Sequence, residues 1–284
     1  MRQSVAVVVS SYNQGSMIRE AVESVLGQTR AADELLVVDD GSTDEGSLHE
    51  LADLERDGIR VLRQHNSGVS AARNAGIRSV AADLVAVLDG DDRFRPGFLR
   101  ATVAALEDDD VVASSSWLTM TGVASGVVGP TGGSVTEFLA RNSCPAPSVF
   151  RRRLWEAVGG YAEDMREGFE DWDFFLRLLT PGGRIHVVAE PLIEYRTQPG
   201  SANLEGMTRR LRLYGDIIDR HRGVFEAHAR SALLAQEAIS IDRLARWEQL
   251  VSADRSLELG EATFGDGGMA AQVRIAAARN HSSS

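Results

Sequence analysis

The stretch DLVAVLDGDDRF, residues 83–94, places three carboxylates directly behind a run of aliphatic residues: Asp89, Asp91 and Asp92. A short segment that is apolar on both faces is typical of a strand buried in a parallel sheet. Carboxylates so close together raise one another's pKa and are costly to keep ionised without a neighbouring positive charge. The stretch therefore predicts a buried strand that ends either in a metal-ion site or in an acidic turn that begins a loop.

The chain before this stretch alternates short apolar runs with segments of helical periodicity. Three further strands are predicted at 5–9, 34–40 and 59–62, and three helices that follow them at 17–28, 44–58 and 67–82. Asp44 suits the N-cap of the second helix, and Ser67 or Ser70 that of the third. This rhythm predicts an α/β fold with a mostly parallel central sheet flanked by helices, in which this part is a Rossmann-like nucleotide-binding half.

Polar residues follow three of these strands at the point where each one ends. The groups are Ser10, Tyr12 and Asn13 after the first strand, Asp39 and Asp40 after the second, and the acidic cluster after the fourth. Open sheets of this kind bind ligands beyond the carboxyl ends of their strands. We therefore expect the three groups to meet at one edge of the sheet.

The rest of the chain mixes helices and strands and then becomes helical. Helices are predicted at 96–109, 151–159 and 170–179, strands at 111–120, 147–150, 184–188 and 191–196, and a glycine-rich loop at 121–134. From 206 to 257 the pattern is helical and rich in arginine. We predict one domain over 1–200, with halves 1–95 and 96–200, then a helical C-terminal extension over 201–260 and a flexible tail over 261–284.

The composition excludes several classes of protein. A formal net charge of −11 argues against a nucleic-acid-binding protein, because such proteins need clustered Lys and Arg. The single cysteine, Cys144, excludes an internal disulfide and a cysteine-based zinc cluster. Without a recognisable signal peptide or membrane span, we expect a cytoplasmic protein, and a peripheral contact with the inner face of the membrane stays open. The oligomeric state stays open as well.

Six motifs, in order, resemble those of the inverting glycosyltransferases of family 2, which have the GT-A fold. They are VVVSSYN, VVDDGSTD, NSGVSAARNAGI, VLDGDD, VGGY and GFEDWDFFLRL, and they lie between residues 5 and 179. The resemblance implies that one sugar passes from a UDP- or dTDP-linked donor to a hydroxyl or amine of an unknown acceptor, with Mn2+ or Mg2+ as cofactor. These ions prefer hard oxygen ligands, which the acidic cluster supplies.

The same resemblance assigns the metal to the acidic cluster. Asp92 would be the principal ligand, Asp91 would assist through the metal or the ribose hydroxyls, and Asp89 would have a supporting role. For Asp89 the alternative is a strand-end residue that only hydrogen-bonds its own loop.

At the nucleotide end, Asp40 would accept a hydrogen bond from the imide N–H of a pyrimidine base such as uracil. Tyr12 would stack on the base, with Ser10 and Asn13 nearby, unless it is a partly buried residue that supports the sheet edge. Asp39 is expected to be structural, because successive strand residues point to opposite faces.

Arg73, in the AARNAGI segment, has two readings. The resemblance places it beside the base or the diphosphate. An arginine on that helix would equally well pair with Asp91 or Asp40 and hold the rim of the site together.

Asp171, in GFEDWDF, occupies the place of the family's catalytic base, with Glu170 beside it. A helix N-terminus favours the ionised form of a carboxylate there, and an ionised carboxylate can take the acceptor's proton. The alternative is an acidic first turn of a helix, which is common for the same dipole reason.

Two departures from the family pattern stand out. Where relatives have YRxHPGS, with a histidine that can reach the metal, this chain has YRTQPGS, so Gln198 replaces a better ligand. His186 belongs to a predicted strand and does not substitute for it. The segment RLARW at 243–247 lacks the glutamine of the QxxRW motif of processive synthases, which favours transfer of single sugars.

Two rival functions remain from the sequence. A sugar nucleotidyltransferase of related fold would have a glycine-rich loop with basic residues after the first strand, whereas SSYNQGSM contains none. A non-catalytic nucleotide-sugar-binding protein would keep Asp40 and lose the metal-binding or base carboxylates, and this chain has all of them.

Overall fold

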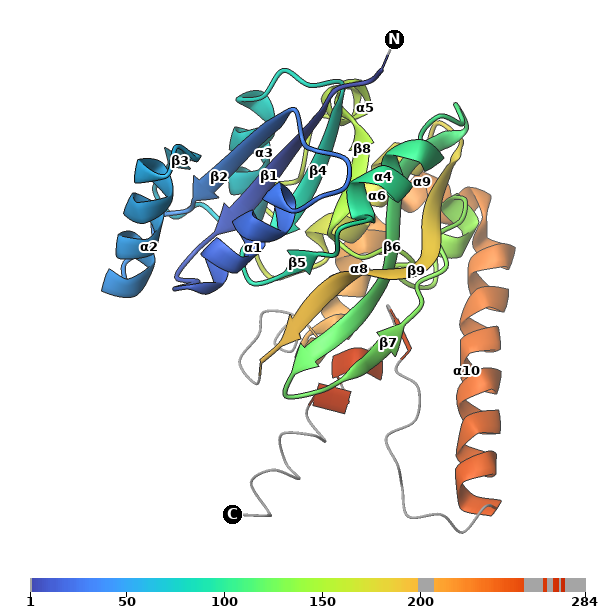
Figure 1. Cartoon of the computed structure of the whole chain (residues 1–284). Coiled ribbons are helices and arrows are strands. Elements are labelled where there is room, and N and C mark those ends of the chain that lie inside the picture. Colours follow the sequence, from blue (N-terminus) through green and yellow to red (C-terminus); the bar gives the residue numbers. More distant parts are fainter. Residues whose placement is uncertain (1, 199–206, 253–262, 265–267, 271, 274–284) are drawn as a thin grey trace.

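The computed structural model describes residues 2–198, 207–252, 263–264, 268–270 and 272–273. In this part of the chain a nine-stranded sheet runs through the centre, helices cover both of its faces, and the C-terminal helices lie along one side (Figure 1). This arrangement confirms the predicted α/β class.

The strands closely follow the apolar runs of the sequence. They are β1 Val5–Ser11, β2 Glu34–Asp39, β3 Arg60–Arg63, β4 Leu84–Asp89, β5 Arg93–Phe94, β6 Val111–Gly122, β7 Gly126–Val128, β8 Ser148–Arg151 and β9 Arg184–Thr197. Their order in the sheet is β3-β2-β1-β4-β8-β6-β9-β5, with β7 paired to β6. Strands β1 to β4 are parallel, and their register sets Ser11 beside Asp39 and Ser10 beside Asp89. The carboxyl ends therefore meet at one edge, as expected.

Most of the helices are somewhat shorter than the sequence predicts, whereas α6 has its predicted bounds. They are α1 Met17–Leu26, α2 Glu45–Arg56, α3 Val69–Arg78, α4 Phe98–Ala105, the 3-10 helix η1 Val135–Phe138, α5 Arg152–Ala157, α6 Glu170–Leu179, α8 Arg210–Arg220, α9 Arg222–Ala227 and α10 Ala229–Ser252. Asp44 caps α2 as predicted, because its carboxylate accepts the N–H of Ser47 at 2.8 Å. The cap of α3 is Gly68 and not Ser67 or Ser70.

Alternate residues of β1 belong to two different cores. Ala6 and Val8 pack with residues of α3 and α6, while Val5, Val7 and Val9 pack with residues of α1, α2 and α4. Because side chains of a strand alternate between faces, α3 and α6 cover one face of the sheet and α1 and α4 the other. Helices thus cover both faces of this part of the sheet, and ligands can approach its strand ends.

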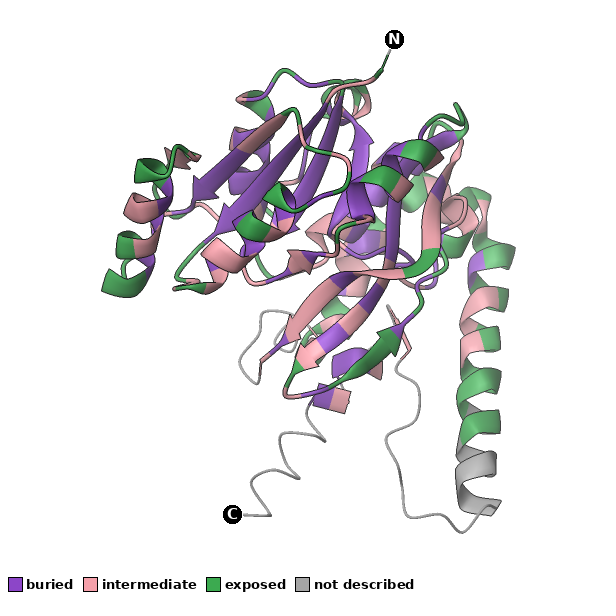
Figure 2. Cartoon of the chain, viewed as in Figure 1, coloured by how far each residue is buried: buried purple, intermediate pink, exposed green. Residues whose placement is uncertain are grey.

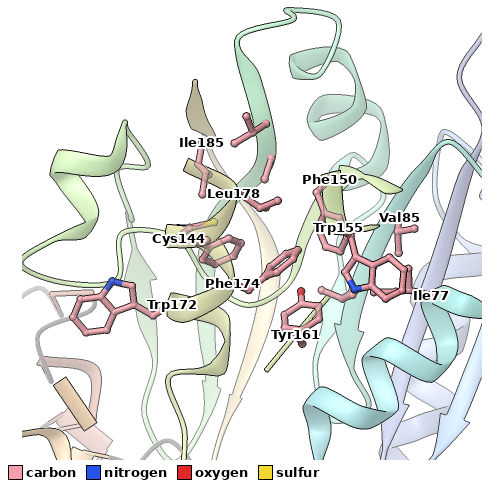
Figure 3. Packing of buried hydrophobic residues seen from close by; sticks show 14 of the residues in the cluster. Ile77, Val85, Cys144, Phe150, Trp155, Tyr161, Trp172, Phe174, Leu178 and Ile185 are labelled. Carbon is pink, nitrogen blue, oxygen red and sulfur yellow. The ribbon is translucent and has the colours of Figure 1, made fainter. Parts of the chain in front are cut away.

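The core under α6 is aromatic and holds the helix firmly. Figure 3 shows Phe174 pointing between Phe150 and Tyr161, with ring centroids 5.0 Å and 4.1 Å away respectively. Trp172 lies at the edge of this cluster and is fully buried. Its neighbour in sequence, Asp171, is therefore presented from a fixed helix end.

Two segments differ from the sequence-based expectation. The glycine-rich segment 121–134 contains a strand, β7, because Gly126–Val128 pairs with Met120, Thr119 and Leu118 of β6. The two strands predicted at 184–188 and 191–196 form one strand, β9, which runs along β6 and absorbs the extra residues in irregularities of register near Trp117.

The C-terminal helices α8, α9 and α10 agree with the helical pattern of the sequence, although the predicted domain boundaries stay predictions. Helix α10 stands at one side of the molecule, and much of its described surface is exposed (Figure 2). Most of the predicted tail, 261–284, lies outside the described residues. Within the described part, no helix is long and apolar enough to cross a bilayer.

Candidate active site

A cleft of about 790 Å³ opens at the carboxyl ends of β1, β2 and β4 and extends to the start of α6. Every site residue predicted from the sequence lines this cleft: Ser10, Tyr12, Asn13, Asp40, Arg73, Asp89, Asp91, Asp92, Glu170 and Asp171. Motifs that are far apart in the chain therefore share one cavity.

At one end of the cleft, Asp40 is buried and fixes the loop before α3. Its carboxylate accepts hydrogen bonds from Gln64 Nε2 at 2.7 Å and from the backbone N–H groups of Ser67 and Gly68, both at 2.8 Å. Asp39 points elsewhere and accepts the N–H of Ser42 at 2.9 Å, which closes the turn after β2. The expectation that Asp39 has a structural contact is met.

Tyr12 and Asn13 form the mouth of this end. Tyr12 is 45% exposed and lines the cleft, and its role in stacking on a base stays a prediction. Asn13 adopts a left-handed backbone with φ of 53°, and its Oδ1 accepts the N–H of Thr43 at 2.8 Å. Ser42 Oγ accepts the N–H of Asn13 at 2.9 Å, so the β1 and β2 ends are tied together.

Arg73 is buried in the middle of the cleft and bridges two carboxylates. Its guanidinium donates to Asp89 at 2.7 Å and to Glu170 at 2.9 Å, and it lies 5.4 Å from the centre of the Tyr161 ring. The partners named from the sequence, Asp91 and Asp40, are therefore wrong. Burial lowers the pKa of Arg73, but the two carboxylates outweigh it and keep the group charged.

The acidic turn after β4 crowds three carboxylates into the cleft. Asp89 is partly neutralised, since Ser10 Oγ donates to it at 3.0 Å in addition to Arg73. Burial, with Asp89 adding to it, raises the pKa of Asp91 to about 6. Burial and then Asp91 and Asp89 raise the pKa of Asp92 well above its usual value. The positive charge of Arg196 lowers the pKa of both groups but does not outweigh these effects.

Arg196, on β9, fixes this turn and was not singled out from the sequence. Its backbone N–H donates to Asp92 Oδ1 at 2.9 Å, and its guanidinium reaches the carbonyl of Asp91 at 3.1 Å and Glu20 at 2.7 Å. The residue stands in the YRTQPGS segment, so the signal was present but was attributed to its neighbour Gln198.

Gln198 also lines the cleft, where its Nε2 contacts the sulfur of Met17 at 3.5 Å. His186 lies in β9 and is not among the residues that line the cleft. Among the described residues, no group of three or more His, Cys, Asp or Glu is already arranged to hold a metal ion.

At the other end of the cleft, Asp171 is held by two hydrogen bonds. Asn142 Nδ2 donates to Oδ2 at 2.8 Å, and the N–H of Trp172 donates to Oδ1 at 2.7 Å. Burial, followed by Glu170, raises the pKa of Asp171 to about 7, although Arg73 and both hydrogen bonds oppose the rise. The helix end therefore does not keep this carboxylate ionised at low pH, contrary to the expectation from the dipole.

The turn before α6 is strained. Phe169 adopts φ of +67°, and Gly168 before it φ of +116°. A bulky residue with positive φ is uncommon and costs on the order of 1 kcal/mol or more, so the surrounding contacts must hold it. Phe169 packs on Trp172, with ring centroids 5.2 Å apart, and the guanidinium of Arg210 lies over both rings.

The C-terminal helices brace the residues around Asp171. Tyr214 of α8 stacks on Trp172 with ring centroids 5.3 Å apart, and its hydroxyl donates to the carbonyl of Leu139 at 2.6 Å. Gln236 of α10 donates to the carbonyl of Ala140 at 2.9 Å, two residues before Asn142. The extension thus supports both α6 and the loop that holds the carboxylate of Asp171.

A buried pair makes a second link from the extension to α6. His221, between α8 and α9, lies 3.0 Å from Asp173, which also receives two hydrogen bonds from Arg177 at 2.9 Å and 2.7 Å. Although burial raises the pKa of Asp173, these partners outweigh it and lower the pKa below the usual value.

The parallel β1–β4 half and the strands that extend its sheet form a fold of GT-A type. Residues 6–130 match the model of the family described as Glycosyl transferase family 2.

Relatives and solved structures agree with this assignment. The chain is 28% identical over 182 residues to the uncharacterized glycosyltransferase YwdF of Bacillus subtilis, covering 61% of this chain and 67% of YwdF. It is 36% identical over 110 residues to the uncharacterized glycosyltransferase alr2836 of Nostoc, covering 38% of this chain but only 34% of that relative. The structure of S. aureus TarS 1-349 in complex with UDP-GlcNAc superimposes with a TM-score of 0.60 at 18% identity, over 76% of this chain and 66% of TarS 1-349, which shows the shared fold.

Proposed function

We propose that the protein is an inverting glycosyltransferase that transfers a single sugar from a UDP- or dTDP-sugar to an acceptor hydroxyl or amine. One observation supports the proposal: Asp40, the acidic turn and Asp171 line the same cleft. The TarS structure that shares this fold was solved with UDP-GlcNAc, which makes UDP-sugars the first donors to test.

The nucleotide end has one acceptor position left for a base. A carboxylate has about four lone-pair sites, and Asp40 already accepts three hydrogen bonds from its own chain. The remaining site suits the single imide N–H of uracil or thymine. The exposed ring of Tyr12 lies at the same mouth of the cleft and offers a surface on which the base can stack.

The acidic turn suits a hard divalent cation. Asp92 and Asp91 would hold Mn2+ or Mg2+ through carboxylate oxygens, and a cation there would favour their ionised forms against burial and the neighbouring carboxylates, which raise the pKa of each. The ion would supply charge neutralisation for the departing diphosphate. Asp89 is already paired with Arg73 and Ser10, which supports the smaller role assigned to it.

Asp171 is proposed as the general base. As the acceptor oxygen or nitrogen attacks the anomeric carbon, its proton passes to the carboxylate, and the bond from that carbon to the nucleotide diphosphate breaks on the opposite side. The sugar configuration inverts, and the proton ends on Asp171. A base with a pKa near the operating pH is well suited to this step, and burial places Asp171 near 7.

The decisive experiment combines the donor, the product and one variant. UDP-GlcNAc and other UDP- and dTDP-sugars are incubated with a panel of hydroxyl and amine acceptors in Mn2+, and release of the nucleotide diphosphate is measured. Product NMR then reports the anomeric configuration, which we expect to be inverted. A retained configuration would contradict the single displacement, and donor binding without any turnover across the panel would instead indicate a non-catalytic binding protein.

Asp171→Asn should lower turnover about 100- to 10,000-fold, because general-base help contributes that much. Binding of UDP by calorimetry should be unchanged, since Asp171 lies at the other end of the cleft from Asp40. Asp109→Asn is the matched control, because its carboxylate is fully exposed on the loop before β6. Full activity of Asp171→Asn would remove Asp171 as the base.

A further inference from the structure

A second cavity, of about 490 Å³, lies beside the catalytic cleft. It is bounded by strand β6, the loop after β7, the loop before β8, helix α10 and the described residues near the C-terminus. The residues that matter for its chemistry are Trp117, Thr131, Arg141, Ser143, Arg246 and Phe264. Phe264 lines the catalytic cleft as well, so the two cavities adjoin.

Among the described residues that line this second cavity, the charged side chains are positive. They are Arg141 and Arg246, and the described lining contains no carboxylate. The catalytic cleft next to it contains the acidic turn, Asp40, Glu170 and Asp171. In a chain with a formal net charge of −11, two arginines among the described residues of one cavity favour an anionic ligand there.

Of the two arginines that line this cavity, Arg141 has no charged or hydrogen-bonded partner among the described residues. It is half-buried, and within the described parts of the chain it makes neither a hydrogen bond nor an ion pair. Arg246, by comparison, is exposed and already paired with Asp242 at 3.0 Å. A guanidinium withdrawn from water without a partner is costly, and its planar fork matches a carboxylate or phosphate. Arg141 is therefore available to bind an anion that is not part of the chain.

The position of Arg141 relates the cavity to the reaction. The next residue, Asn142, lines the catalytic cleft and donates to the carboxylate of Asp171, while Ser143 again lines the second cavity. Consecutive Cα atoms lie about 3.8 Å apart, so one short loop faces both the proton acceptor and the positive cavity. A molecule whose hydroxyl reaches Asp171 can place a neighbouring part beside Arg141.

Trp117 supplies an apolar wall to the same cavity. The indole packs closely on Gly129, where a Cβ would come within 3.0 Å of Cε2 of the ring, so the absence of a side chain permits this contact. The ring thereby lies against the loop that follows β7. The cavity combines one cation with one rigid aromatic surface.

We propose that this cavity is an acceptor subsite and that the acceptor bears an anionic group, a phosphate or a carboxylate, which Arg141 binds beside Trp117. The assignment rests on the proposed glycosyltransferase function and narrows its acceptor class. Arg141 binds the substrate at a distance from the reacting atoms and takes no part in the proton transfer.

Equilibrium binding tests the subsite without requiring turnover. The protein is first saturated with UDP and Mn2+, so that phosphate groups cannot enter the donor site, and glucose 6-phosphate is then titrated by calorimetry, with glucose as the neutral comparison. Wild type should bind glucose 6-phosphate more tightly than glucose. Arg141→Gln should weaken the binding of glucose 6-phosphate about tenfold or more, as expected for loss of a charge-assisted hydrogen bond. Arg141→Lys should retain part of the affinity.

The matched control is Arg153→Gln, which makes the same charge change at an exposed position of α5, away from both cavities. It should leave the binding of glucose 6-phosphate unchanged. Equal affinity of wild type for glucose 6-phosphate and glucose, or equal affinity of wild type and Arg141→Gln for glucose 6-phosphate, would overturn the subsite.

Transfer assays then distinguish phosphate from carboxylate. Paired acceptors, glucose 6-phosphate against glucose and glucuronate against glucose, give ratios of kcat/KM that should exceed one in wild type for at least one pair. Arg141→Gln should reduce that ratio about tenfold, and ratios that do not respond to Arg141 would contradict the proposal. A failure of the proposed glycosyltransferase function would look different from a failure of the subsite. In that case UDP would not bind, or no donor would be turned over with either acceptor of a pair.

Discussion

The guanidinium of Arg73, on α3, lies 2.9 Å from the carboxylate of Glu170, the first residue of α6. The same guanidinium lies 2.7 Å from Asp89 at the end of β4. One buried side chain thus joins the nucleotide-binding half of the sheet to the helix that presents Asp171. The electrostatics of the donor end and of the base are coupled through this residue.

Removing the charge of Arg73 should therefore change the titration of Asp171. Arg73 lowers the pKa of Asp171, so Arg73→Gln should move the midpoint of the pH–rate profile upward by about one unit or more. Arg78→Gln, on the same helix but exposed and paired only with Glu163, should leave the midpoint in place. A midpoint that is the same in Arg73→Gln and wild type would show that Asp171 does not set the profile.

The wild-type rate should depend on pH through the ionisation of Asp171. Its pKa is raised to about 7, and only the ionised form accepts a proton, so single-turnover rates at saturating donor should fall about tenfold per unit below pH 7 and level off above it. Quench-flow measurements from pH 5 to 9 test this. A rate that does not change between pH 5 and pH 7 would mean that a group other than Asp171 accepts the acceptor's proton.

Stability should respond to the same ionisation with a defined sign. The pKa of Asp171 rises from 3.8 in the unfolded chain to about 7 in the folded one, so the folded state holds this proton more tightly. The resulting stabilisation is fully present below about pH 3.8 and is lost as the pH rises through about 7. Asp171→Asn cannot titrate, and its Tm relative to wild type should therefore increase between pH 5 and pH 8 in thermal denaturation.

Metal dependence should require Asp92. Wild type should bind UDP more tightly in the presence of Mn2+ or Mg2+, and Asp92→Ala should abolish this difference, because the proposed ligand is gone. Calorimetry with and without the ion measures both affinities, and Asp109→Ala serves as the exposed control. Undiminished metal dependence in Asp92→Ala would exclude Asp92 from the site.

The brace on the catalytic helix should contribute measurable stability. Tyr214→Phe keeps the ring stacked on Trp172 and removes the hydrogen bond that its hydroxyl donates to Leu139, together with the one it accepts from Gln236 at 3.2 Å, which should cost about 0.5–1.5 kcal/mol for each bond. For a chain of this size, Tm should fall about 2–4 °C per kcal/mol. Leu211→Ala, at an 87% exposed position of the same helix, should change Tm little. An unchanged Tm for Tyr214→Phe would mean that these hydrogen bonds contribute no net stability.

The local hydrophobic pattern of the sequence was sufficient to predict the parallel half of the fold. It was also sufficient to predict which residues meet in the cleft. Apolar runs give the strands, and the polar residues that follow them converge because parallel strands share an edge. The helix 170–179 was predicted with its observed bounds, so Asp171 lands at its first turn. The roles of these residues stay predictions, since location alone does not test chemistry.

The partners of the site residues could not be predicted in the same way. Asn142 with Asp171, Arg73 with Glu170, and Arg196 with Asp92 are contacts between elements far apart in the chain, set by how β9 and α6 pack. The sequence shows that Asp171 lies at the start of a helix, where the dipole lowers the pKa of a carboxylate. It does not show that the side chain is buried, and this burial reverses the direction of the pKa shift. It also reduced the segment 121–134 to a loop because glycines conceal the short strand β7.

The stacking of Tyr214 on Trp172 bears on how this protein could be recombined with others. The helices after residue 207 cannot be exchanged freely, because they cover the indole of Trp172. The residue before Trp172 in the sequence is Asp171, the proposed base. A chimera that joined residues 2–198 to a foreign C-terminal segment would expose that aromatic surface and release the loop before Asn142. Any modular exchange of acceptor specificity within this architecture must therefore transplant α8 and α10 together with the helix that they cover.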